Sequence, residues 1–109
     1  MKKIKKLLKR GLYTDEIDYI NVQRMIKQNN NIILLDVRNI LEFEESHLPG
    51  ALNISLGELE NKVGLLIPNR GQTIIVYCNS GIKSRVATEI LMDMGYTDVY
   101  ELKGGLDSI

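Results

Sequence analysis

The residue with the clearest chemical potential is a single cysteine, together with the loop that follows it. Cys78 comes directly after the apolar, β-branched run 73–77, and the loop 79–83 separates it from a helical pattern that begins at Ser84. In parallel sheets, ligands bind beyond the carboxyl ends of the strands. Backbone N–H groups of a tight loop and of a helix start can converge there on an anion, and they favour thiolate over thiol. The pattern therefore predicts a stabilised sulfur anion, with Gly81 allowing the loop to turn back.

Two reactions fit a thiolate in such a loop. It can attack a sulfur donor, hold the transferred sulfur as a persulfide and pass it to a nucleophile, or it can attack phosphate. A cysteine phosphatase grips the phosphoryl group with an arginine at the position that Ser84 occupies here, with Lys83 before it and Arg85 after it. A loop that ends at Lys83 is shorter than the loop of a phosphatase, and it fits one sulfur atom better than a phosphoryl group. Sulfur transfer is therefore favoured, and a small phosphatase or arsenate reductase is the less favoured alternative.

The composition limits the size of the protein, its possible partners and the compartment in which this chemistry could take place. The 109 residues fit one domain, and 14 basic residues balance 14 acidic ones, which argues against a nucleic-acid partner. One cysteine cannot form an internal disulfide, so a reducing cytoplasm is the simplest compartment. With one cysteine and one histidine, no zinc or iron–sulfur site can be built from such ligands, and we expect neither a metal nor a cofactor. No run approaches the about 18 apolar residues of a membrane span.

The charge is unevenly distributed. Residues 1–10 carry six bases and no acid, which leaves eight bases against 14 acids in the rest of the chain. We interpret residues 1–18 as a solvated basic extension and residues 19–109 as the folded domain. Ile4, Leu7 and Leu8 lie at helical spacing, which leaves open a short amphipathic helix on a membrane surface or a partner.

Strand and helix patterns alternate along the rest of the chain, which predicts a small α/β domain with a mostly parallel sheet. The predicted strands are residues 32–35, 51–54, 73–77 and 99–102. The predicted helices are residues 22–28 capped by Asn21, a short one within 41–47, 56–66 capped by Ser55 with Glu58 completing a capping box, and 84–94. The last helix is expected to face the core through Val86, Ala87, Ile90, Leu91 and Met94 and to stop at Gly95.

Several polar residues have structural interpretations. Asp36 and Arg38 follow a buried strand and carry opposite charges, so we expect them to form pairs that shape the cleft. His47 precedes the turn 48–50 and is expected to hold that loop rather than to activate the cysteine. A solvated helix face is predicted for Glu42, Glu44 and Glu45.

Four segments, in this order and spacing, resemble the rhodanese family of thiosulfate sulfurtransferases over about residues 19–108. They are Leu34-Leu35-Asp36-Val37-Arg38, Glu42-Phe43 with the run from His47 to Ile54, Cys78 to Ser84, and Leu102-Lys103-Gly104-Gly105-Leu106. The resemblance implies a rhodanese-like three-layer domain, with a central five-stranded, mostly parallel sheet flanked by helices. It implies that Cys78 carries the persulfide, with Asp36 and Arg38 in support. The implied substrate-binding residues are Asn79, Ser80, Gly81, Ile82, Lys83 and Ser84.

The function expected from this resemblance is sulfur transfer through Cys78, from thiosulfate or a protein persulfide to cyanide or a thiol acceptor. Lys83 stands where the family often has arginine. The ammonium group of lysine is a point charge and binds thiosulfate less well than the planar guanidinium group of arginine does. The sequence also ends at Ile109, where family members continue into a further helix, which we expect to lower stability or leave a surface for a partner. The substituted cation and the basic residues 1–10 leave an alternative open, a weak or non-catalytic module that relays or senses sulfur.

Overall fold

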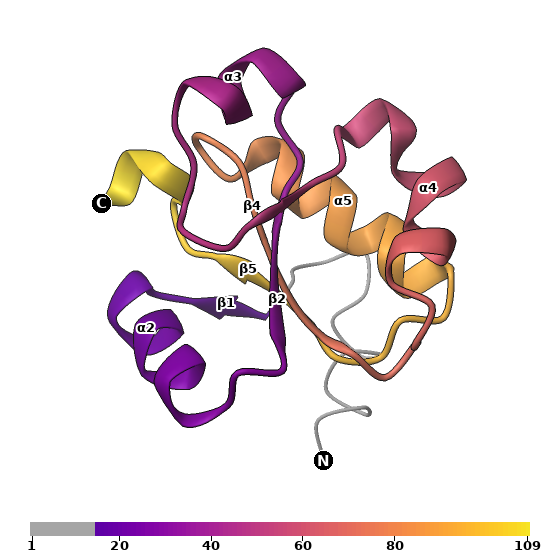
Figure 1. Ribbon diagram of the computed structural model, residues 1–109, viewed down its shortest axis with the longest axis horizontal. Coiled ribbons are helices and arrows are strands. Elements are labelled where there is room, and N and C mark those ends of the chain that lie inside the picture. The colour runs from indigo at the N-terminus through magenta and orange to yellow at the C-terminus, as the bar shows by residue number, and fades with distance from the viewer. Residues whose placement is uncertain (1–14) are drawn as a thin grey trace.

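Five short parallel strands form the centre of the computed structural model, which describes residues 15–109 (Figure 1). The strands are β1 (Glu16–Ile17), β2 (Ile32–Asp36), β3 (Leu52–Asn53), β4 (Thr73–Tyr77) and β5 (Val99–Leu102). Their order is β1-β5-β4-β2-β3, and all neighbours pair in parallel. This confirms the predicted five-stranded parallel sheet.

Helices cover both faces of the sheet and complete three layers (Figure 1). One face is covered by α2 (Tyr19–Gln28), and the other by α4 (Leu59–Leu66) and α5 (Ile82–Asp93). The shorter elements are α3 (Ile40–Glu45) and the 3₁₀ turns η1 (Leu56–Glu58) and η2 (Gly105–Ser108). Because β2, β4 and β5 are covered on both faces, their sequences are nearly continuous apolar runs.

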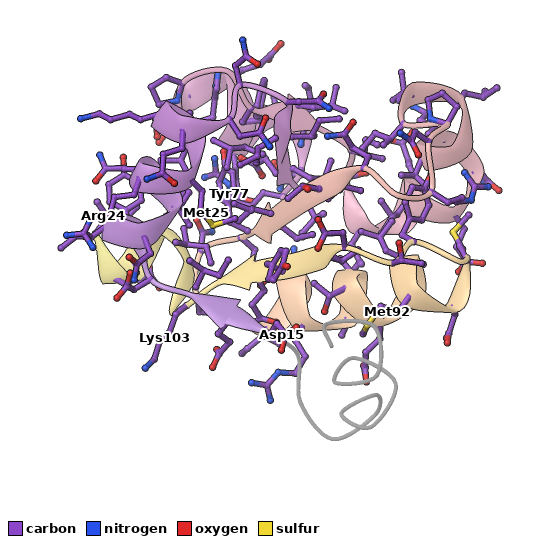
Figure 2. All side chains as sticks on the ribbon, turned by 90° about the horizontal axis from the view of Figure 1, so that it is seen from below. Asp15, Arg24, Met25, Tyr77, Met92 and Lys103 are labelled. Atoms are coloured by element: carbon purple, nitrogen blue, oxygen red, sulfur yellow. The ribbon has the colours of Figure 1, made fainter. Side chains whose placement is uncertain are left out.

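The hydrophobic core is divided by the sheet into two clusters. On the α4 and α5 side, Leu59, Val63 and Leu91 pack with no exposed surface against alternate residues of β2 and β4. On the α2 side, Val22 packs against Ile75 and Tyr77. Met25 of α2 lies beside Tyr77 on this face (Figure 2).

Three helix starts differ from those predicted. α5 begins at Ile82, two residues before the predicted start at Ser84, and α2 and α4 differ in their caps. α2 begins at Tyr19 with Asp18 as its cap, whose carboxylate accepts from Asn21 N at 3.0 Å, so the prediction of Asn21 as cap is wrong. The extra turn lets the half-buried Tyr19 pack onto the sheet. Ser55 makes no cap bond to the backbone. Its hydroxyl donates to Glu58 Oε1 at 3.0 Å, and a 3₁₀ turn precedes α4, so the predicted capping box is also wrong.

The core-facing residues of α5 agree with the prediction except at one position: Ala87 and Leu91 are buried, and Ile90 and Met94 are partly buried against the same cluster. Ser84, Ala87, Thr88 and Leu91 are buried, at the spacing of one helix face. Val86 lies to the side of that stripe and is 43% exposed, so its predicted core position is wrong. Gly95 ends the helix with φ +96°, as predicted.

Strand β1 has no counterpart among the predicted elements. It adds to the edge of β5, where Glu101 N donates to the Asp15 carbonyl and Lys103 N donates to the Ile17 carbonyl. The basic residues 1–10 and the helix considered there lie outside the described residues. Within residues 15–109, no helix is long and apolar enough to cross a membrane.

The strand order places a crevice at the carboxyl ends of β2 and β4. From β2 the chain continues to β3 at one edge of the sheet, whereas from β4 it continues to β5 on the other side. The connections therefore diverge between these two strands, which is where open α/β sheets bind ligands. The register pairs Asp36 with Tyr77, so Arg38 and the loop after Cys78 meet at this end, near α3 (Figure 1).

Candidate active site

Cys78 follows β4 directly, and its sulfur lies inside the loop that it begins. Sγ accepts hydrogen bonds from Gly81 N at 3.1 Å and from Ser84 N at 3.4 Å, and the residue is 2% exposed. Main-chain N–H groups that point to one position carry partial positive charge, which suits an anion bound there. The structure thus brings Cys78, Gly81 and Ser84 together as the sequence predicts.

The turn of the loop depends on Gly81. Its φ is +100°, outside the range that side chains tolerate well, and it stands as the cap residue before α5. This conformation turns its N–H back toward Sγ. The first turn of α5 then presents its free N–H groups on the same side, including that of Ser84.

The hydroxyl of Ser84 completes the surroundings of the sulfur. Its Oγ lies 3.6 Å from Sγ and donates to the Gly81 carbonyl at 3.1 Å, and the residue is fully buried. A hydroxyl both donates and accepts, so it can accept from the thiol and can turn its proton to the sulfur once that proton has left.

A second segment holds the loop from the C-terminal side. Leu106 N donates to the Cys78 carbonyl at 2.9 Å, and Asp107 N donates to the Asn79 carbonyl at 2.8 Å. Gly105 makes this approach possible: a Cβ there would lie 2.6 Å from the Cys78 carbonyl oxygen and 2.5 Å from that of Asn79. The resemblance pointed to Gly104-Gly105, but the contact with the loop emerges from the structure.

Asp36 and Arg38 form a buried ion pair at the other side of the loop. Arg38 Nη2 lies 2.8 Å from Asp36 Oδ2, and Nε bonds both carboxylate oxygens. The hydrogen bond to Asp36 raises the pKa of Arg38 above its usual value. Arg38 also donates to Asn79 Oδ1 at 3.3 Å and to the Ser46 carbonyl at 2.6 Å. The two residues therefore tie β2 to the start of the loop.

Glu42 differs from the solvated position expected for it. It is half-buried, and its Oε2 accepts from Asn79 Nδ2 at 2.7 Å, whereas Glu44 and Glu45 are exposed. The sequence pattern cannot separate the three glutamates, because their difference depends on which of them faces a loop 37 positions away.

His47 lies in the segment before the turn, with contacts inside that segment. Its ring stacks on Phe43 with centroids 3.7 Å apart, and its Nδ1 lies 2.7 Å from the Phe43 carbonyl. Tyr77, which the sequence reasoning did not single out, holds the same turn: its hydroxyl accepts from Leu48 N at 3.1 Å. Burial raises the pKa of Tyr77 well above its ordinary value.

The remaining loop side chains face outward. Ser80 and Lys83 are exposed, and Ile82 is 74% exposed. A groove of about 540 Å³ runs along the outside of the loop and is bordered by Arg85 and by Lys103, which extends from the end of β5 (Figure 2). Within residues 15–109, no group of three histidine, cysteine or acidic side chains is placed to hold a metal ion.

Comparison with known proteins agrees with this arrangement. Residues 20–109 match the rhodanese-like domain family. The chain is 43% identical over 75 residues to the thiosulfate sulfurtransferase PspE of Escherichia coli, covering 69% of this chain and 71% of PspE. It is 31% identical over 91 residues to the putative sulfur carrier protein YrkF of Bacillus subtilis, covering 84% of this chain and 48% of YrkF.

A solved structure shares both the fold and part of the sequence. The rhodanese-related protein of Thermoplasma volcanium superposes with a TM-score of 0.74 at 28% identity, covering 86% of this chain and 88% of that one. The sheet, the flanking helices and the family match over nearly all described residues lead to one conclusion. This chain belongs to the rhodanese family.

Proposed function

We propose that this protein is a rhodanese-type sulfurtransferase that carries sulfane sulfur as a persulfide on Cys78. In the first step the Cys78 thiolate attacks the outer sulfur of thiosulfate. The S–S bond of thiosulfate breaks, and sulfite leaves with the electron pair. In the second step cyanide or a thiolate attacks the outer sulfur of the persulfide, and Cys78 leaves again as thiolate.

The observation that carries this proposal is the pair of N–H bonds from Gly81 and Ser84 to Sγ. Both the attacking thiolate and the persulfide are anions, and N–H groups of the loop and of the start of α5 can stabilise such anions. The proposal assigns backbone binding of the substrate to Asn79, Ser80, Gly81, Ile82, Lys83 and Ser84. A cysteine that works as a free thiol suits a reducing compartment such as the cytoplasm.

Intact-mass analysis after incubation with thiosulfate tests the proposal. The expected result is the gain of one sulfur atom, its removal by cyanide with formation of thiocyanate, and no gain in Cys78→Ser. Circular dichroism checks that this variant is folded. Thiocyanate formation by Cys78→Ser at the rate of the original protein would refute the mechanism.

A second candidate is a relay that receives sulfur from a protein persulfide. It is favoured by Lys83, whose point charge stands where the family often has arginine, and by the likeness to a relative named as a putative sulfur carrier. Negligible turnover with thiosulfate, combined with rapid persulfide formation from a cysteine desulfurase, would select the relay over the thiosulfate enzyme.

A further inference from the structure

The side chain of Asn79 connects the loop to two other elements at once. Its Nδ2 donates to Glu42 Oε2 of α3 at 2.7 Å, and its Oδ1 accepts from Arg38 at 3.3 Å. Its main-chain carbonyl accepts from Asp107 N. The residue directly after Cys78 is therefore bonded in three directions, whereas the side chains of Ser80, Ile82 and Lys83 are exposed.

Both anchors of the Asn79 amide are themselves fixed. Glu42 lies in the first turn of α3, where its N–H donates to the capping side chain of Asn39 at 2.9 Å. Arg38 is 5% exposed and is held by the carboxylate of the fully buried Asp36. The amide group has one favourable orientation between them, because its N–H must face the anion and its oxygen the cation.

A fixed Asn79 matters for the sulfur because the loop is short. Sγ is bound by amides on the far side of the loop, at Gly81 and Ser84, and a shift of the loop start changes the distance to both. Small misplacements of preorganised donors lower reaction rates strongly. Glu42 touches neither Sγ nor these donors, so it can act on them through Asn79.

We propose that Glu42 is a positioning residue, which holds the sulfur-carrying loop in its active shape through the amide of Asn79. The inference rests on the proposed function and adds a residue that the resemblance did not assign to the site. The proposal requires complementary groups at the two positions: a hydrogen-bond donor on one of residues 79 and 42 must face an acceptor on the other.

A charge-swap cycle tests this requirement. Asn79→Asp places a carboxylate against Glu42 and is expected to slow persulfide formation from thiosulfate roughly tenfold, the size of one charge-assisted hydrogen bond turned to repulsion. Adding Glu42→Gln restores a donor opposite an acceptor, since the glutamine amide donates to the new carboxylate. The double variant is expected to recover most of the rate, which a merely structural loss would not allow.

Matched controls are Asn61→Asp on the exposed surface of α4 and Glu44→Gln on the exposed face of α3, which are expected to react like the original protein. Urea unfolding shows which variants are folded. If Asn79→Asp does not fold, Glu42→Ala decides, because alanine offers no acceptor to the Asn79 amide: it should react several-fold more slowly than Glu44→Ala, and equal rates overturn the proposal.

The two proposals fail in different ways. If the unaltered protein gains no sulfur on Cys78, the proposed function is wrong. If it does gain sulfur, and Asn79→Asp reacts as fast as Asn61→Asp or is not rescued by Glu42→Gln, the positioning role is wrong while the function stands.

Discussion

Replacing Gly105 by alanine should loosen the loop that follows Cys78, because this glycine lets η2 approach the start of that loop. The new Cβ would lie 2.5 and 2.6 Å from the carbonyl oxygens of Asn79 and Cys78, which are backbone atoms that cannot turn away. The φ of +63° adds strain for any side chain. The segment must therefore move, and the bonds from Leu106 N and Asp107 N to these carbonyls weaken.

The expected loss follows from these two effects. Left-handed backbone costs about 1–2 kcal/mol for a residue with a side chain. Each of the two hydrogen bonds contributes about 0.5–1.5 kcal/mol. Gly105→Ala should thus lower the free energy of unfolding by roughly 3 kcal/mol.

Gly95→Ala provides the control. Its φ of +96° is at least as unfavourable for alanine, but a Cβ there would meet nothing within 4 Å. This variant should lose only the strain energy of about 1–2 kcal/mol.

Urea unfolding followed by circular dichroism measures both variants, and intact mass measures the rate of persulfide formation. Gly105→Ala should be clearly the less stable variant and should react at least roughly tenfold more slowly than Gly95→Ala. Equal unfolding free energies would refute the reasoning, because the close approach of η2 would then not restrain the loop.

Three further predictions concern buried polar groups. Arg38→Ala leaves the Asp36 carboxylate buried without its partner and should lower the unfolding free energy by about 3–5 kcal/mol in urea titrations; a loss under 1 kcal/mol would contradict this. Ser84→Ala removes a donor to the Gly81 carbonyl and a neighbour of Sγ, so we expect about 1 kcal/mol lower stability and slower thiosulfate-dependent persulfide formation by intact mass; an unchanged rate would exclude a role for the hydroxyl. Burial raises the pKa of Tyr77 in the folded state, so its stabilising contribution is complete below the ordinary pKa of 10.0 and is lost as the pH rises above it. Urea midpoints measured across that range should fall less steeply for Tyr77→Phe, and parallel curves would show that Tyr77 does not control the alkaline transition.

Much of the fold is predictable because the sequence patterns that indicate its strands and helices involve residues close together in the chain. The runs that became β2 and β4 are mostly apolar and rich in β-branched residues, which is typical of strands covered on both faces. β1 has only two residues and no pattern of its own, since it forms by adding to the exposed edge of β5. The helix of 82–93 was predictable in position and in most of its core-facing residues, but Ser84 and Thr88 are buried and Val86 is exposed.

For the site, the chain alone was enough to select Cys78, Gly81 and Ser84, since a thiol after a buried strand and a glycine before a helix start are neighbours in sequence. The roles of Glu42 and Gly105 depended on tertiary structure. Glu42 contacts the loop from α3, and Gly105 contacts it from the segment after β5. Strand order and register determine these contacts between distant parts of the sequence. The chemistry of a side chain is local, but whether it is solvated or bonded depends on what the fold brings against it.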